Sequence, residues 1–104
     1  MTVEVSTRVT QYQVNALPES ILDAHHWDVT VEYRGDGKWA ICHFRQCLGD
    51  DGEWDFEPSP SSRTDEWLAT HRFTEEEALR LAREQAPNIT VNGLTPADVI
   101  ARHN

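Results

Sequence analysis

Apolar and polar residues alternate between residues 27 and 57 with the two-residue period of half-buried strands. Two glycine-containing turns, Gly35-Asp36-Gly37 and Gly49-Asp50-Asp51-Gly52, divide this stretch into three runs. The runs hold three of the four tryptophans of the chain. This pattern predicts a three-stranded antiparallel β-meander over residues 27–57, around which the other segments are organised.

The lengths of the two turns predict which residues face each other across the meander. A three-residue first loop places Tyr33 opposite Trp39, and the same register places Val31 opposite Ile41. A four-residue second loop places Cys47 opposite Trp54. Both turns then agree on one apolar face, which we expect to be the core side of the sheet. Its members are Trp27, Val29, Val31, Tyr33, Trp39, Ile41, Trp54 and Phe56.

The opposite face of the meander is polar on its outer strands and has a small apolar stripe at its centre, formed by Ala40, Cys42 and Phe44. We expect the N-terminal segment to cover this stripe, or the stripe to be exposed. In one regular strand the Cα atoms of Cys42 and Cys47 would lie roughly 16 Å apart. Because a disulfide requires a much shorter separation, two free thiols are expected, as in a reducing compartment.

The spacing of apolar residues changes to a helical period after Thr74. Thr74 and Glu77 form a capping box, and Pro87 ends the pattern, so the main helix is predicted over residues 74–86. Thr95 and Pro96 repeat these start signals for a short C-terminal helix over residues 95–103. The sequence thus predicts an α+β fold: an antiparallel β-meander of three to five strands, with the main helix packed on its aromatic face.

The remaining segments give weaker patterns. Residues 1–14 are interpreted either as a strand with a bulge or as a mobile start over residues 1–10 followed by a strand. Residues 15–24 are expected to contain one or two helical turns, residues 66–70 a helical turn, and residues 88–91 a short strand. A length of 104 residues fits one domain, 1–104.

The formal net charge of −9 argues against binding to nucleic acids or to anionic membranes, because both need clustered lysine and arginine. The sequence contains no apolar run of the roughly 18 residues that a membrane span requires. Residues 1–5 lack the basic and apolar regions of a signal peptide. A cytoplasmic location is therefore expected.

Five residues offer ligand atoms for a metal ion: His25, His26, Cys42, His43 and Cys47. Their spacing does not match the short fixed pairs of structural zinc sites. Cys42 and His43 also fail as a catalytic dyad, since neighbours in a strand point to opposite faces. No cofactor and no metal site is predicted, and the chain is expected not to be an enzyme. A small metal-dependent enzyme is kept as an alternative.

Acidic residues gather between residues 49 and 66, where seven acids stand against one base, Arg63, and so supply six of the nine excess negative charges. Such a surface suits a basic protein partner, because complementary charge speeds association. It could also imitate a phosphate backbone, as in a DNA-mimic inhibitor, or merely keep a sheet edge soluble. The partner-binding residues predicted are Asp50, Asp51, Glu53, Asp55, Glu57, Asp65, Glu66 and Trp67, the last as an aromatic anchor unless it caps the core.

Two stretches, Gly37-Lys38-Trp39-Ala40-Ile41 and the segment from His71 to Ala82, resemble small uncharacterised accessory proteins of actinobacterial phages. The closing Val91-Asn92-Gly93-Leu94-Thr95 is similar as well. The resemblance covers residues 27–103 and concerns the architecture alone. It implies a compact helper protein that binds a host or phage protein, and it carries no active-site residue onto this chain.

Overall fold

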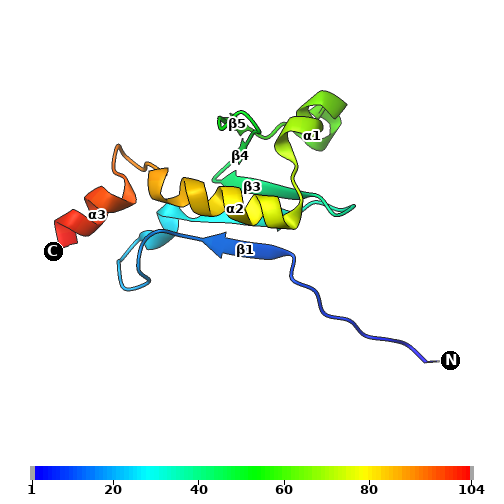
Figure 1. Cartoon of the computed structure of the whole chain (residues 1–104), viewed down its shortest axis with the longest axis horizontal. Coiled ribbons are helices and arrows are strands. Elements are labelled where there is room, and N and C mark those ends of the chain that lie inside the picture. Colours follow the sequence, from blue (N-terminus) through cyan, green and yellow to red (C-terminus); the bar gives the residue numbers. More distant parts are fainter. Residues whose placement is uncertain (1, 104) are drawn as a thin grey trace.

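The computed structural model describes residues 2–103, and its centre is a five-stranded antiparallel sheet (Figure 1). The strands lie in chain order: β1 (Gln11–Val14), β2 (Val29–Tyr33), β3 (Trp39–His43), β4 (Gln46–Leu48) and β5 (Trp54–Phe56). The α-helices of the described chain are α1 (Asp65–His71), α2 (Glu75–Gln85) and α3 (Pro96–His103). Short 3-10 helices are η1 (Ala24–Trp27), η2 (Pro60–Ser62) and η3 (Ala86–Asn88). The predicted α+β meander with a main helix and a C-terminal helix is confirmed.

The register predicted for the first turn is confirmed. Tyr33 lies opposite Trp39 and Val31 opposite Ile41, and the backbone N–H of Arg34 donates to the carbonyl of Lys38 at 2.8 Å. The tight loop is possible because Gly35 and Gly37 adopt positive φ angles of 92° and 71°, which glycine reaches without steric cost.

The register predicted for the second turn is wrong by one residue. Leu48 lies opposite Trp54, and Cys47 opposite Asp55. The hairpin closes instead at Gly49, whose N–H donates to the carbonyl of Glu53 at 2.8 Å. Cys47 lies on the face of Ala40 and Cys42, away from the aromatic face.

The chain also turns once more than predicted. β3 ends at His43, and a two-residue turn at Phe44 and Arg45 leads directly back into β4, so that His43 faces Gln46. Phe44 adopts a φ of 54°, which is uncommon for a residue other than glycine, asparagine or aspartate. The sequence therefore contains no ordinary turn signal at this position.

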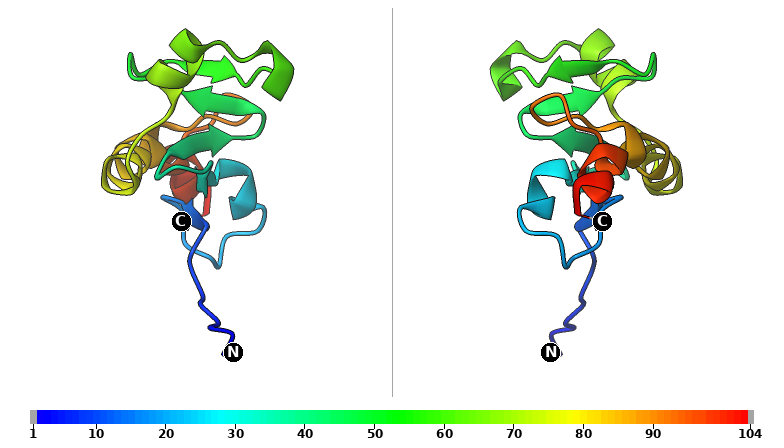
Figure 2. Two further views of the ribbon diagram at one scale, coloured as in Figure 1. Left: turned by 90° about the vertical axis from the view of Figure 1, so that its right-hand side faces the viewer. Right: turned by 90° about the vertical axis from the view of Figure 1, so that its left-hand side faces the viewer.

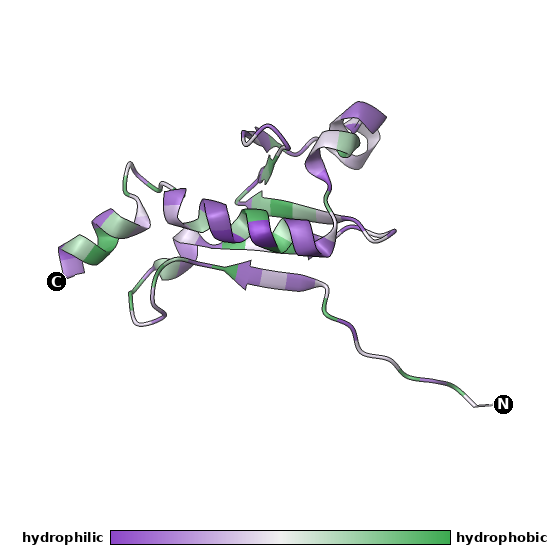
Figure 3. Cartoon of the chain, viewed as in Figure 1, coloured by the Kyte–Doolittle hydropathy of each residue, from purple (hydrophilic) through white to green (hydrophobic). Residues whose placement is uncertain are grey.

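The main core lies between the sheet and α2. Ala78 and Ala82 of α2 are fully buried, and their small side chains let the helix lie close to β2 and β3, which contribute the buried Val31 and Ile41. Thr74 caps α2 by accepting a hydrogen bond from the N–H of Glu77 at 3.3 Å, as predicted. Figure 3 shows hydrophilic residues along α2 interrupted by hydrophobic ones. Of the predicted core face, Phe56 is the exception: it is 73% exposed, since β5 lies at the sheet edge beyond the core.

The apolar stripe on the opposite face is covered, but not by the N-terminal segment. Ala40 and Cys42 are buried together with Cys47, and Trp67 of α1 packs against them. Phe44 lies at the turn and is 69% exposed. The expectation of an N-terminal cover or an open stripe is thus corrected: α1 covers this face, and the views in Figure 2 show α1 at the β5 end of the sheet.

Phe73 is the middle residue of the three-residue link between α1 and α2. Its N–H donates to the carbonyl of Trp39 at 2.9 Å, and its carbonyl accepts the N–H of Trp39 at 2.8 Å. Trp39 thereby uses the edge of β3 that β4 leaves unpaired. These two hydrogen bonds fix the chain where it crosses from the face of the sheet that α1 covers to the face that α2 covers.

The N-terminal segment contributes only the four-residue strand β1 at the far edge of the sheet. Residues 2–10 form no regular element and leave Val3, Val5 and Val9 exposed. Trp27 belongs to η1 and not to a strand, yet it is buried as predicted, and its indole N–H donates to the carbonyl of Leu94 at 3.0 Å.

The C-terminal region differs from the prediction in one element. Residues 88–91 form no strand; Val91 and Leu94 make an isolated bridge around a turn instead. Thr95 and Asp98 cap α3 reciprocally, since the Asp98 carboxylate accepts from the N–H of Thr95 and the Thr95 hydroxyl from the N–H of Asp98. Within residues 2–103, no helix combines the length and the apolar character needed to cross a membrane.

Candidate functional site

Two regions of the molecule gather polar groups near α1. The first is a partly buried cluster between α1 and the sheet, and the second is a rim of exposed carboxylates around β5 and the start of α1. We refer to them as the α1 cluster and the acidic rim. The α1 cluster consists of Arg34, Cys42, Cys47, Asp55, Glu57, Arg63, Trp67, His71 and Arg72.

Glu57 is the centre of the charges in the α1 cluster. Its carboxylate lies 2.9 Å from the guanidinium of Arg72 and 3.3 Å from those of both Arg34 and Arg63. The side chain of Arg72 is only 6% exposed and that of Glu57 17% exposed. One carboxylate thus pairs with three cations, which directly follow β2, η2 and α1 in the chain; Arg34 is also paired with Glu32, at 3.5 Å.

His71 fixes the position of α1 against β5. It is buried, with Nε2 at 2.8 Å from the Asp55 carboxylate and Nδ1 at 2.8 Å from the carbonyl of Trp67. Its ring stacks on the indole of Trp67 with the ring planes 1° apart and the centroids 4.2 Å apart. The guanidinium of Arg72 lies 5.2 Å from the Trp67 ring centroid, in cation–π range. Trp67 is therefore a packing residue of this cluster.

The two thiols lie at the base of the α1 cluster. The sulfur atoms of Cys42 and Cys47 are 3.5 Å apart, because the missed turn at Phe44 places the two residues opposite each other on β3 and β4. The predicted separation of roughly 16 Å between their Cα atoms assumed one continuous strand and was wrong for this reason. Arg34 approaches Cys42, with Nη2 at 3.7 Å from the sulfur.

The contact between the thiols changes their acidity in opposite directions. The hydrogen bond that the two sulfur atoms share lowers the pKa of Cys47; the charges of Arg72 and Arg34 act in the same direction, whereas burial and the Glu57 carboxylate oppose the shift. The same shared hydrogen bond, together with burial, raises the pKa of Cys42.

The acidic rim includes five of the predicted partner-binding residues, all of them exposed: Asp50, Asp51, Glu53, Asp65 and Glu66. Among the described residues none of these five carboxylates forms an ion pair. The other three predicted residues are engaged internally, Asp55 with His71, Glu57 with the arginines, and Trp67 with His71. The predicted set thus divides into an outward group and a group that holds the fold together.

The predicted metal-ligand candidates do not form one site. Cys42 and Cys47 face α1, whereas His43 packs on the other side against Trp54, with ring centroids 6.1 Å apart. His25 and His26 lie in η1, not in extended chain, and their ring centroids are 4.2 Å apart. Within residues 2–103, one group could hold a metal ion: Asp23, His25 and His26, whose ligand atoms all lie within 4.8 Å of one another.

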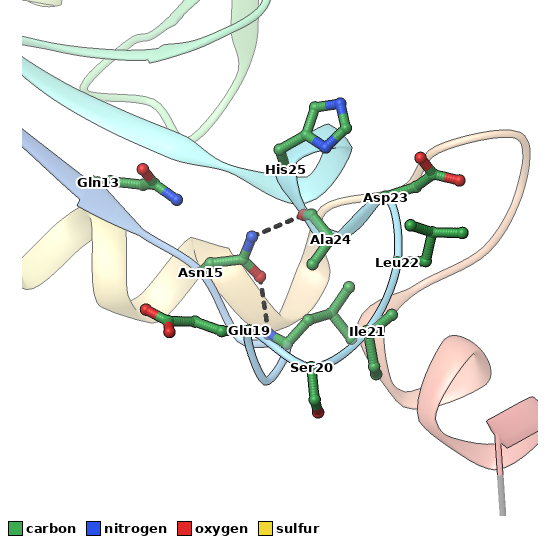
Figure 4. A pocket seen from close by; sticks show the side chains of 10 residues that line it. Gln13, Asn15, Glu19, Ser20, Ile21, Leu22, Asp23, Ala24 and His25 are labelled. Atoms are coloured by element: carbon green, nitrogen blue, oxygen red, sulfur yellow. Dashed lines mark hydrogen bonds between the residues drawn. The ribbon is translucent and has the colours of Figure 1, made fainter.

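Two surface pockets accompany these features. A pocket of about 390 Å³ lies beside η1, and Figure 4 shows Asn15 at its wall, with hydrogen bonds to the carbonyl of Ala24 and from the N–H of Leu17. A second pocket, of about 320 Å³, lies beside the α1 cluster. Its basic lining residues are Arg34, Lys38 and Arg72, and its acidic ones Asp36 and Asp65. Arg34 and Arg72 already bind Glu57, whereas Lys38 forms no ion pair among the described residues.

Comparison with known proteins gives no relative. No family model matches the chain, and neither a curated protein nor a solved structure matches it.

Sequence reasoning missed the α1 cluster. Arg34, Arg63 and Arg72 are far apart in the chain, and only the fold brings them to one carboxylate. The signal that could have found the thiol pair was the short spacing of Cys42 and Cys47, which equals that of a hairpin with a two-residue turn.

Proposed function

We propose that this chain is a non-enzymatic protein-binding module that holds an extended, basic segment of another protein along the outer edge of β5. The observation that carries the proposal is the coincidence of an unpaired strand edge, an exposed aromatic residue and the acidic rim. Adding a strand to a sheet edge is a common mode of segment recognition, in which backbone hydrogen bonds supply affinity and side chains supply selectivity.

The backbone of β5 offers its hydrogen-bonding groups outward at two residues. Glu53 and Glu57 bond inward, to the N–H of Gly49 and the carbonyl of Arg45 respectively. Since alternate residues of an antiparallel strand direct their backbone groups to opposite sides, Trp54 and Phe56 direct theirs to the outer edge. The described residues supply no hydrogen-bond partner for these outer groups.

Charge and apolar surface at this edge favour a segment that alternates basic and apolar residues. The five carboxylates of the acidic rim attract a basic chain and disfavour an acidic one. Phe56 is 73% exposed and offers an apolar contact on one side of the added strand. Acidic residues at an edge also discourage pairing between two copies of the same chain, which is consistent with a different protein as the occupant.

The experiment uses a short synthetic peptide that alternates lysine and valine, with binding followed by fluorescence anisotropy and by the amide NMR signals of the protein. We expect saturable binding and shifts of the Trp54 and Phe56 amides. Binding should weaken at about 1 M salt, where electrostatic screening acts over about 3 Å. A peptide that alternates glutamate and valine, and a lysine–valine peptide with N-methylated backbone amides, should both fail to bind.

Two protein variants test the two parts of the interaction. Phe56→Pro removes the outward N–H and is tolerated at an edge strand, so it should weaken binding while the fold persists. Asp50→Lys combined with Glu53→Lys should abolish binding, whereas Glu19→Lys with Glu76→Lys, the same charge change at exposed sites elsewhere, should leave most of it. Equal losses in both double variants, or full binding of the N-methylated peptide, would refute strand addition at β5.

A further inference from the structure

The two cysteines occupy a backbone position suited to a disulfide. Trp39 directs its N–H and carbonyl toward Phe73, on the β4 side of β3. His43 lies four residues further along the strand, so its N–H and carbonyl point to the same side, where His43 pairs with Gln46 and closes the β3–β4 turn. Cys42 and Cys47 are then the adjacent pair without mutual backbone hydrogen bonds, for which the Cα atoms lie about 4.5 Å apart. That separation lies within the range of about 4.4–6.8 Å that disulfides span.

From this geometry we propose that Cys42 and Cys47 are a redox-active dithiol, which hydrogen peroxide converts reversibly into an intramolecular disulfide. The sulfur atoms are 3.5 Å apart and no other cysteine exists in the chain. Bond formation brings them to about 2.05 Å, a movement of about 1.5 Å that rotation of the two side chains can supply.

The chemistry takes place in two balanced steps. The Cys47 thiolate attacks one oxygen of hydrogen peroxide, the O–O bond breaks, and the products are a sulfenic acid and hydroxide, which takes up the proton lost by the thiol. The Cys42 sulfur then attacks the sulfur of that sulfenic acid and gives up its proton, so that a disulfide forms and water leaves. In total two thiols are oxidised, and one peroxide is reduced to two waters.

Cys47 is suited to the first step by its surroundings. The two sulfur atoms share a hydrogen bond at 3.5 Å, which together with the charges of Arg72 and Arg34 favours the Cys47 thiolate against the opposing effects of burial and of the Glu57 carboxylate. Cys42 lies within reach for the second step. Its neighbour Arg34, with Nη2 at 3.7 Å from the sulfur, stabilises negative charge that develops there.

Access to the pair is controlled by α1. Cys47 is fully buried and Cys42 is 5% exposed, and Trp67 packs over both. A small oxidant such as hydrogen peroxide can reach the sulfur atoms after slight movements of α1, whereas a bulky disulfide oxidant requires α1 to move away. Reaction with hydrogen peroxide should therefore be faster than reaction with oxidised glutathione, and Trp67→Ala should reduce the difference.

The test treats the full-length folded protein with hydrogen peroxide, denatures it, alkylates the remaining thiols and measures its mass. We expect a monomer that has lost two hydrogens and takes up no alkyl group, and dithiothreitol should restore two alkylatable thiols. Two thiols that stay alkylatable, a product carrying added oxygen on sulfur, or a covalent dimer would each overturn the proposal.

Single variants test the order of the two steps. In Cys42→Ser the first step should stop at a sulfenic acid on Cys47, which dimedone traps. In Cys47→Ser the remaining Cys42 should be trapped more slowly, because it loses the partner that shares its hydrogen bond. Trapping at equal rates would overturn the assignment of Cys47 as the attacking sulfur. This inference does not depend on binding at β5, and either can fail without the other.

Discussion

Glu57→Gln tests the central ion cluster of the molecule. The substitution keeps the shape of the side chain but removes the charge that pairs with Arg34, Arg63 and Arg72, of which Arg34 retains Glu32 as a second partner. The Arg72 pair is nearly buried, with side chains 6% and 17% exposed, and breaking a buried pair costs about 3–5 kcal/mol. Because water still reaches part of Glu57, we take the lower value of about 3 kcal/mol for the loss of folding free energy.

Urea unfolding followed by tryptophan fluorescence measures this loss. With a slope of about 1–3 kcal/mol per molar urea, a loss of about 3 kcal/mol lowers the midpoint by about 1–3 M. Glu77→Gln is the matched control, since Glu77 lies 3.9 Å from Arg80 and both side chains are about half exposed. An exposed pair of this kind contributes less than about 1 kcal/mol.

A double-mutant cycle with Arg72→Met measures how much of the stability lost in Glu57→Gln comes from the interaction between Glu57 and Arg72. We expect Arg72→Met to be strongly destabilising alone, and the double variant to be less destabilised than the sum of the two single variants, because no uncompensated charge remains between Glu57 and Arg72. A Glu57→Gln loss no larger than that of Glu77→Gln would refute the view that this cluster stabilises the fold.

Three further variants test other parts of the structure. Thr74→Ala removes the cap of α2 and should lower the free energy of unfolding in urea by about 1 kcal/mol. This loss should exceed that of a substitution to alanine at an exposed position in the middle of the helix. Ala82→Leu should destabilise by about 1–3 kcal/mol, since Ala82 is fully buried against the sheet, and a neutral result would contradict the close packing of α2. The hydrogen bond from the N–H of Thr95 lowers the pKa of Asp98, so its stabilisation is present at neutral pH and is lost as the pH falls through that lowered pKa. Thermal unfolding should therefore show Asp98→Asn less stable than wild type at pH 7 and the two converging well below pH 4, about the ordinary pKa of aspartate.

The parts of the fold that local signals specify were predictable from sequence. The Gly35–Gly37 turn sets the β2–β3 register through residues that favour positive φ, and Thr74 with Glu77 defines the start of α2. The turn at Phe44 was not predictable in this way. A phenylalanine in the left-handed region is held there by the pairing of β3 with β4, and so by contacts and not by its own preference.

The candidate site shows the same division. The exposed carboxylates of the acidic rim follow from composition, because charged residues seldom lie inside a protein. The roles of Asp55 and Glu57 do not follow from composition. Their sequence neighbours are acids like them, and only the folded positions of His71 and Arg72 make these two carboxylates internal partners.

The reciprocal hydrogen bonds between Trp39 and Phe73 suggest a modular plan for the molecule. The chain leaves β3 at Phe44 and returns to the same strand at Phe73, so residues 44–72 form an insertion on a smaller unit made of β1, β2, β3 and α2. The entropy of closing such a loop grows only with the logarithm of its length, by about 0.6 kcal/mol per doubling. The exposed loops of the inserted segment can therefore change in length at small entropic cost, whereas its strand β4 cannot, because Leu48 is buried in the main core of the smaller unit.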